Sequence, residues 1–185
     1  SSLYSEKNSY DDIADKLPAY MRGYVEGLCS AQKNVYGYNF IEDALTDEWV
    51  SDFVSTVGFD PLPADYETDL KGIIADTYLN CRCTELERKH TLDAVSRHFH
   101  VDLYTQSDSS MLPRVKNRGI ADSERVMPKI FKCSKINLNI TLRSIKSGVP
   151  QRALDIMGCG GFLMSNYQPE LAEYFIPGED LVLYD

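Results

Sequence analysis

The sequence predicts an α/β protein in which a parallel sheet follows a long helical segment. Residues 136–141 alternate apolar and polar side chains with a period of two, as a strand does. After a polar loop comes a short helix with apolar residues on one side, which glycines at positions 158, 160 and 161 bring to an end. A second apolar run, Phe162–Met164, precedes a helix that opens with Pro169. Two strand–helix units in succession indicate parallel strands joined by right-handed crossovers.

The helical segment is predicted to cover residues 1–98. Apolar residues recur about every four positions in it, which is the spacing of a helix with one buried face. Gly58 is a suitable C-cap for one of these helices. Thr84–Glu87 has the pattern of a capping box and predicts that the last helix begins there. The expected helices are residues 10–36 with a break at Pro18, then Phe40–Val57, Tyr66–Leu79 and a fourth from Thr84.

Residues 99–185 are predicted to form a Rossmann-like half-domain around the parallel sheet. Besides the two strand–helix units, this part contains three more apolar runs of strand length and one more stretch with helical spacing. These are the expected strands Val101–Thr105, Pro113–Asn117 and Leu181–Tyr184, and the expected helix Ser123–Cys133. Both ends of the sequence look cut, so we expect part of a longer protein.

Composition narrows the class of partner. The 185 residues carry a net charge of −9, which argues against nucleic acid because few cations are available to neutralise phosphates. No apolar run approaches the ~20 residues of a membrane span. Five cysteines, scattered among apolar residues, favour reduced thiols and a cytoplasmic protein. Cys81 and Cys83 with nearby histidines match no common zinc spacing, so no metal site is predicted.

The most informative polar segment is the loop Leu142–Gln151. It follows the first predicted strand of the sheet, and ligands of open parallel sheets sit beyond the carboxyl ends of the strands. The loop runs into the start of a helix that carries Arg152 and Asp155. A structural interpretation stays open for both residues, because Asp155 also suits a helix start through the dipole and Arg152 also suits a surface ion pair.

Four segments together resemble the CgeB-type (spore maturation) glycosyltransferase-like proteins. The resemblance extends over about Glu87 to Asp185, and its most specific part is Val149–Asn166, where an acidic residue is followed by Met, Cys, Gly and an apolar strand. That family looks like the C-terminal half of a two-domain GT-B glycosyltransferase. The four segments are Gly119–Asp122, Met127–Phe131, Ser134–Thr141 and Arg152–Leu163.

The resemblance implies that this half binds a nucleotide-sugar donor and needs no cofactor or metal. Asp155 falls at the acidic position that accepts hydrogen bonds from ribose hydroxyls, and a carboxylate suits a vicinal diol. The backbone at Gly119 and Ile120 is expected to lie against the base. Free amides at the helix start suit a diphosphate, with Arg152 as a bidentate donor. The remaining expected substrate-binding residues are Ser144, Ser147, Gly148, Asn139 and Glu170.

A purely structural interpretation is also open for two of these assignments. Glu170 lies in the first turn after Pro169 and suits its own helix start, and Asn139 suits a solvated strand face. The sequence also departs from the family pattern twice. Ser147 stands where retaining GT-B enzymes usually carry a second Glu, and Leu79–Arg88 contains no glycine where a phosphate-binding turn is expected.

The favoured function is therefore the donor-binding portion of a GT-B-type glycosyltransferase, with its N-terminal GT-B half outside this sequence. The two departures favour an alternative, a catalytically inactive Rossmann-like module for protein contacts in spore-coat or surface assembly. A helical regulator on an α/β scaffold is a third interpretation. The Tyr- and Leu-rich helical segment also suits a homodimer contact.

Overall fold

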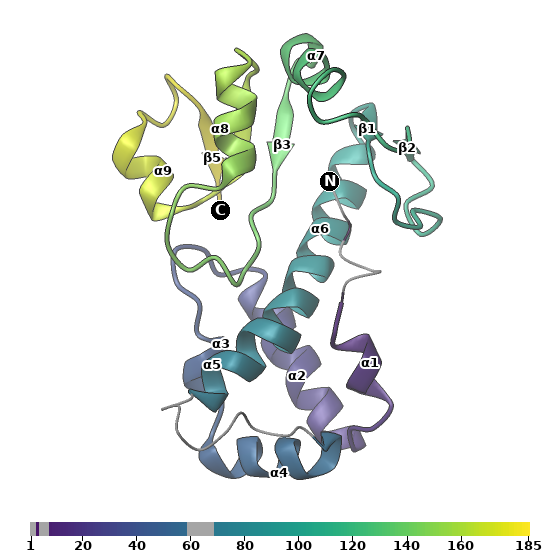
Figure 1. Ribbon diagram of the computed structural model, residues 1–185, viewed down its shortest axis with the longest axis vertical. Helices are drawn as coiled ribbons and strands as arrows, with labels where there is room; N and C mark the ends of the chain where they lie inside the picture. The colour runs from purple at the N-terminus through teal and green to yellow at the C-terminus, as the bar shows by residue number, and fades with distance from the viewer. Residues whose placement is uncertain (1–2, 4–7, 59–68) are drawn as a thin grey trace.

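The computed structural model describes residue 3, residues 8–58 and residues 69–185, and these form a mixed α/β fold. Helices of the first hundred residues make up one part, and short parallel strands with their helices make up the other (Figure 1). The predicted fold class, an α/β protein with a Rossmann-like parallel sheet, is confirmed. No helix among the described residues is both long and apolar enough to cross a lipid bilayer.

The helical part follows the predicted order, but several element boundaries differ. Pro18 precedes a helix as its N-cap, and Gly58 ends another with a φ of 72°. The predicted helix Phe40–Val57 is two helices, because Thr46 adopts an extended backbone and its hydroxyl caps the Trp49 amide. The elements are α1 (Asp11–Ala14), α2 (Ala19–Gln32), α3 (Ile41–Ala44), α4 (Asp47–Val57), α5 (Leu70–Ile74), the π-helical turn η2 (Ala75–Leu79) and α6 (Asn80–Ser96).

The predicted helix start at Thr84 is wrong. Helix α6 continues directly from η2, so Thr84 lies inside a helix and its hydroxyl donates to the Asn80 carbonyl at 2.7 Å. A serine or threonine can make this bond within a helix as well as at a cap, and the sequence pattern does not separate the two. Residues 66–68 of the expected third helix lie outside the described residues.

The α/β part contains two parallel sheets. Strands β1 and β2 pair with each other, and β3, β4 and β5 pair in that order, with Asn137 opposite Leu163 and Met164 opposite Val182. Four of the strands are shorter than predicted, whereas β4 begins one residue later and ends two residues later than the predicted run Phe162–Met164. The elements are β1 (Val101–Leu103), β2 (Val115–Asn117), α7 (Met127–Cys133), β3 (Asn137–Asn139), α8 (Gln151–Gly158), β4 (Leu163–Asn166), α9 (Pro169–Tyr174) and β5 (Val182–Tyr184).

Each part has its own apolar core, and α6 contributes residues to both parts. One core lies among the N-terminal helices and includes Phe53 and Leu79, whereas another lies among α7, α8 and α9 around Leu163. A third, smaller cluster joins Leu92 of α6 to Leu103 of β1. Helix α6 is therefore the long helix that connects the helical part to the sheets, as Figure 1 shows.

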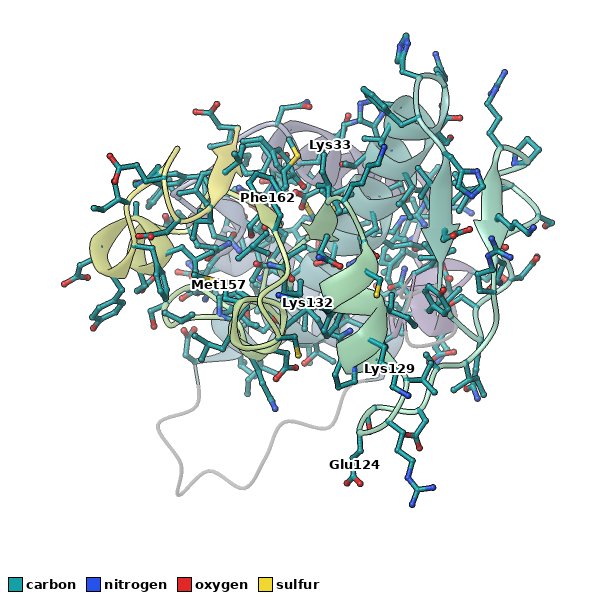
Figure 2. All side chains as sticks on the ribbon, turned by 90° about the horizontal axis from the view of Figure 1, so that it is seen from above. Lys33, Glu124, Lys129, Lys132, Met157 and Phe162 are labelled. Atoms are coloured by element: carbon teal, nitrogen blue, oxygen red, sulfur yellow. The ribbon has the colours of Figure 1, made fainter. Side chains whose placement is uncertain are left out.

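The carboxyl ends of the larger sheet point toward the helical part (Figure 1). The opposite, amino end carries α7 and the start of β4. Figure 2 views the molecule from that end and labels Lys129 and Lys132 of α7 and Met157 of α8. Gly161 makes the turn into β4 here, and a Cβ on it would lie 2.5 Å from the Phe131 carbonyl oxygen. Ligand-binding loops are thus expected at the other end, between the two parts.

Candidate functional site

A small pocket of about 210 Å³ lies where β3 and β4 end. Three segments form it, namely the connection between α2 and α3, the loop after β3 and the residues after β4. We call it the strand-end pocket. It is lined by Gly37, Tyr38, Asn39, Leu142, Arg143, Ile145, Lys146, Tyr167, Gln168 and Pro169.

Arg143 holds these segments together. Its side chain is only 8% exposed, and its Nε donates to the Glu87 carboxylate of α6 at 2.7 Å. Its two terminal nitrogens donate to the carbonyls of Val35 and Lys33 at 2.7 and 3.1 Å. The Asn39 amide donates to the Arg143 carbonyl at 2.7 Å. One buried guanidinium therefore joins the loop after β3 to α6 and to the end of α2.

The buried side chains at the strand ends are polar. Asn139 of β3 donates to the hydroxyls of Ser165 and Thr141, at 2.9 and 3.1 Å. Asn166 of β4 accepts a hydrogen bond from the Thr141 amide at 2.9 Å and donates to Glu87 at 3.4 Å. All five side chains are buried. Because buried polar groups are costly unless bonded, this network specifies how the strand ends meet α6.

Lys146 supplies the cation at the mouth of the pocket. Its ammonium pairs with Glu42 of α3 and lies 3.7 Å from an Asp76 carboxylate oxygen. The hydrogen bond with Glu42 raises the pKa of Lys146 above its usual value, and Asp76 adds to this. The ammonium is therefore fully charged at neutral pH, where a phosphate oxygen can compete with the two carboxylates for it.

The start of α8 lies beside this loop and presents free backbone amides. Pro150 is the N-cap and provides no side-chain cap, and the first amide bonded to it is that of Ala153. The amides of Gln151 and Arg152 therefore have no protein partner within the described part of the chain. Helix N-termini with free amides bind anions.

Arg152 and Asp155 share α8 but do not form an ion pair with each other in the described residues. The Arg152 guanidinium lies over the Phe131 ring of α7, with its carbon 5.6 Å from the ring centre. Asp155 is exposed one turn later on the helix. Neither residue lines the strand-end pocket.

The other predicted residues lie in two separate segments, one after β3 and one after β2 of the smaller sheet. Ser144 is half-buried in the loop, whereas Ser147 and Gly148 are exposed, with a φ of 99° at Gly148. Gly119 has a φ of 76°, its amide donates to the Asn117 side chain, and the neighbouring Ile120 is 71% exposed.

The surroundings of Asn139 and Glu170 suit a structural role for both side chains. Asn139 is 5% exposed and belongs to the strand-end network, so the solvated-face interpretation is wrong. Glu170 lies in the first turn of α9, and its Oε2 is buried without a hydrogen-bond partner among the described residues. An acceptor left unpaired in this way is uncommon in folded proteins.

Sequence reasoning missed the five residues that join the two parts at the pocket. Glu87 and Arg143 are 56 positions apart, and Asn39 lies 104 positions from Arg143. Lys146 meets Glu42 across a similar separation. The only signal for Arg143 was its position just after a predicted strand, while Glu87 resembled the last residue of a capping box.

Cys83, which was considered for a zinc site, is a core residue. Its side chain is fully buried, and its thiol donates to the Cys29 carbonyl. Burial raises the pKa of Cys83 to about 12. Within the described residues no three His, Cys, Asp or Glu side chains are grouped as metal ligands.

The fold and the carboxyl edge of the larger sheet define the class of protein. It contains a Rossmann-like domain with polar loops beyond the ends of its strands. Comparison with protein-family models then matches residues 87–185 to the family described as glycosyl transferase-like. The match covers more than half of the 185 residues, and the chain belongs to this glycosyl transferase-like family. Comparison with curated proteins and with solved structures gave no match.

Proposed function

We propose that the chain binds the nucleotide-sugar donor of a GT-B-type glycosyltransferase and acts in glycosyl transfer. The observation that carries this proposal is the polar loop after β3, which leads into the uncapped start of α8 at the carboxyl edge of the sheet. In a family of glycosyl transferase-like proteins, an anion site beyond the strand ends suits the diphosphate of the donor. More specifically, we propose that the protein is a glycosyltransferase-like protein of the CgeB type that its sequence resembles.

The donor is proposed to extend from phosphates at the loop after β3 to a base at the segment after β2. The amides of Gln151 and Arg152 face the diphosphate, and Lys146 adds a cation. Asp155 is exposed on the following turn, where its carboxylate is available for the ribose hydroxyls. Gly119 and its exposed neighbour Ile120 suit contact with the base.

We also propose that residues 1–98 and 99–185 are two functional parts. The helical part closes the carboxyl edge through Arg143, so a donor at this edge lies between the parts. The family match begins at residue 87, inside α6, which agrees with α6 serving both parts.

Calorimetric titration of the chain with UDP-, GDP- and ADP-sugars tests the donor site. We expect one class of nucleotide-sugar to bind, and Asp155→Asn to weaken its binding about tenfold or more, since a hydrogen bond to a charged group is lost. Asp12→Asn, which changes an exposed carboxylate of α1, is the matched control and leaves the affinity unchanged. Absence of heat with every donor would contradict the proposal.

That negative result would favour the alternative, an inactive Rossmann-like module for protein contacts. Two observations favour this alternative. Ser147 replaces the acidic residue of retaining enzymes, and the three donor nitrogens of Arg143 are already bonded inside the protein. The module would then retain the fold and the buried network without binding a nucleotide.

A further inference from the structure

The end of the larger sheet that lies opposite the strand-end pocket carries a cluster of lysines. In residues 1–98 acidic side chains outnumber basic ones two to one, whereas residues 99–185 carry equal numbers of the two. Within this second part, residues 114–135 hold seven basic side chains and two acidic ones. A chain with a net charge of −9 therefore concentrates positive charge in one short stretch, which includes β2 and α7.

Three lysines of this stretch lie at the amino end of the sheet. Lys129 and Lys132 are three positions apart on α7, so their side chains leave the same side of the helix. The Lys132 ammonium reaches the turn before β4, where it would lie 2.8 Å from a Cβ placed on Gly160. Lys135 follows two residues after the end of α7. All three lysines are exposed, and none forms an ion pair within the described part of the chain.

Two apolar side chains lie beside these lysines. The Asn137 amide donates to the Phe162 carbonyl at 2.9 Å, which brings the start of β3 against the start of β4. Ile136 and Phe162 are therefore neighbours, and they are 57% and 45% exposed. Figure 2 views this end of the molecule and labels three of the five side chains. We call the five residues the amino-end patch, namely Lys129, Lys132, Lys135, Ile136 and Phe162.

Acidic side chains at the same end lie apart from the patch. Glu124 precedes α7 and lies at the margin of the molecule in Figure 2, beyond Lys129. Glu179 and Asp180 precede β5, which is two strands away from β3 in the sheet and thus roughly 10 Å from it. The local charge around the patch is therefore positive.

The composition of the patch suits an anionic lipid surface. A lysine can bury its apolar stem at such a surface and keep its ammonium among the phosphates of the headgroups. Protein surfaces that lie in the headgroup region combine lysines with exposed apolar side chains, as this patch does. Interfaces between proteins, in contrast, are depleted of lysine relative to the rest of the surface. A membrane thus fits the patch better than an acidic protein does.

The acidic helical part does not oppose this contact. Figure 1 shows it at the other end of the long axis, and α6, which connects the two ends, has 17 residues and is about 25 Å long. Charges are screened over about 8 Å at physiological ionic strength, so most of the acidic side chains have little effect at the patch. The asymmetry of charge instead orients the chain, with the helical part away from an anionic surface.

We propose that the amino-end patch binds the surface of an anionic phospholipid membrane. The carboxyl edge of the sheet, with the strand-end pocket, then faces away from the membrane and stays open to water-soluble ligands. The proposal does not depend on the donor site, because no residue of the patch lines the strand-end pocket.

The test is co-sedimentation of the chain with vesicles of equal parts phosphatidylcholine and phosphatidylglycerol, and with vesicles of phosphatidylcholine alone. We expect saturable binding to the anionic vesicles only, and weaker binding as salt is added. Lys132→Gln and Lys135→Gln should each lower the partition coefficient about fivefold, which corresponds to the loss of one lysine near an anionic surface. Lys16→Gln removes an exposed lysine of the helical part and is the matched control, which should bind as the parent chain does.

Ile136→Ser separates attraction by charge from contact with the apolar region of the lipid. This variant keeps every lysine, yet it should bind the anionic vesicles about fivefold more weakly, because less apolar surface leaves water. Its urea midpoint should stay close to that of the parent chain, since the side chain is largely exposed in the folded protein.

Three results would overturn the proposal. The first is absence of binding to the anionic vesicles, and the second is equal binding by Lys132→Gln and Lys16→Gln. The third is binding of the chain to poly-glutamate without binding to the vesicles, which would make an acidic protein the partner of the patch.

Discussion

Replacing Arg143 by Met tests whether the buried ion pair couples the two parts of the chain. The side chains of Arg143 and Glu87 are 8% and 2% exposed, and their atoms approach to 2.7 Å. Met keeps much of the length of the side chain but leaves the Glu87 carboxylate without its partner. It also removes the hydrogen bonds to the carbonyls of Lys33 and Val35.

We expect Arg143→Met to lower the free energy of unfolding by about 3–5 kcal/mol, the usual cost of leaving a buried charge unpaired. Arg97→Met is the matched control, because Arg97 pairs with Asp93 on the surface and is 60% exposed. Loss of such a pair costs about 0–1 kcal/mol. Adding Glu87→Gln to Arg143→Met should recover part of the loss, so the double variant costs at least ~1 kcal/mol less than the sum of the single ones.

Urea unfolding followed by two probes measures both the cost and the coupling. Trp49 is the single tryptophan and lies in the helical core, so its fluorescence reports on that part, while far-ultraviolet circular dichroism reports on both. In the parent chain we expect the two transitions to coincide. In Arg143→Met they should separate, since the buried ion pair between the parts is gone.

Two results would refute this reasoning. One is a cost for Arg143→Met no greater than that for Arg97→Met. The other is a double-variant cycle that is additive within ~0.5 kcal/mol, which is expected of residues that do not interact. Either would mean that the ion pair accompanies the contact between the parts without stabilising it.

Two further predictions concern packing and pH. Gly161→Ala should destabilise the fold by about 1–3 kcal/mol in urea unfolding, because the new Cβ would lie 2.5 Å from a backbone carbonyl oxygen; Gly158→Ala, with open space around its Cβ, should be neutral or stabilising. Burial alone would raise the pKa of Glu85, but hydrogen bonds and charges from Lys89 and Arg82 outweigh it and lower the pKa. Its contribution to stability is therefore present above the unfolded pKa of about 4.3 and is lost as the pH falls through the folded pKa, so Glu85→Gln should lose less stability than the parent chain between pH 6 and pH 3. Equal losses in the two proteins would contradict the assignment of Glu85.

The order of elements was predictable because it depends on local patterns. The strand–helix alternation around β3, α8, β4 and α9 follows from side-chain periodicity and from the glycines and prolines that end each element. Pro18 and Gly58 act as expected. The break at Thr46 and the continuous run from η2 into α6 were not predicted, because the same residue type serves as a cap or as an interior residue.

The contacts at the carboxyl edge of the larger sheet were not predictable, because they join residues that are far apart in the sequence. The partners of Arg143 come from α6 and from the end of α2, and no local pattern marks them. The sequence singled out the loop after β3, and four residues of this loop line the strand-end pocket. It did not show that Arg152 rests on Phe131, or that Arg143 faces inward.

The choice of polar groups at the contact between the two parts has a physical consequence. A buried ion pair such as Glu87–Arg143 is often no more stabilising than apolar residues of the same volume, so its presence is not required for a stable contact. Its geometry is specific, however, since each of the three guanidinium nitrogens of Arg143 donates to one acceptor. An apolar contact would tolerate sliding of the loop after β3 against α6, whereas this one fixes their register. Arg143 also lines the strand-end pocket, so the register that the ion pair fixes shapes that pocket as well.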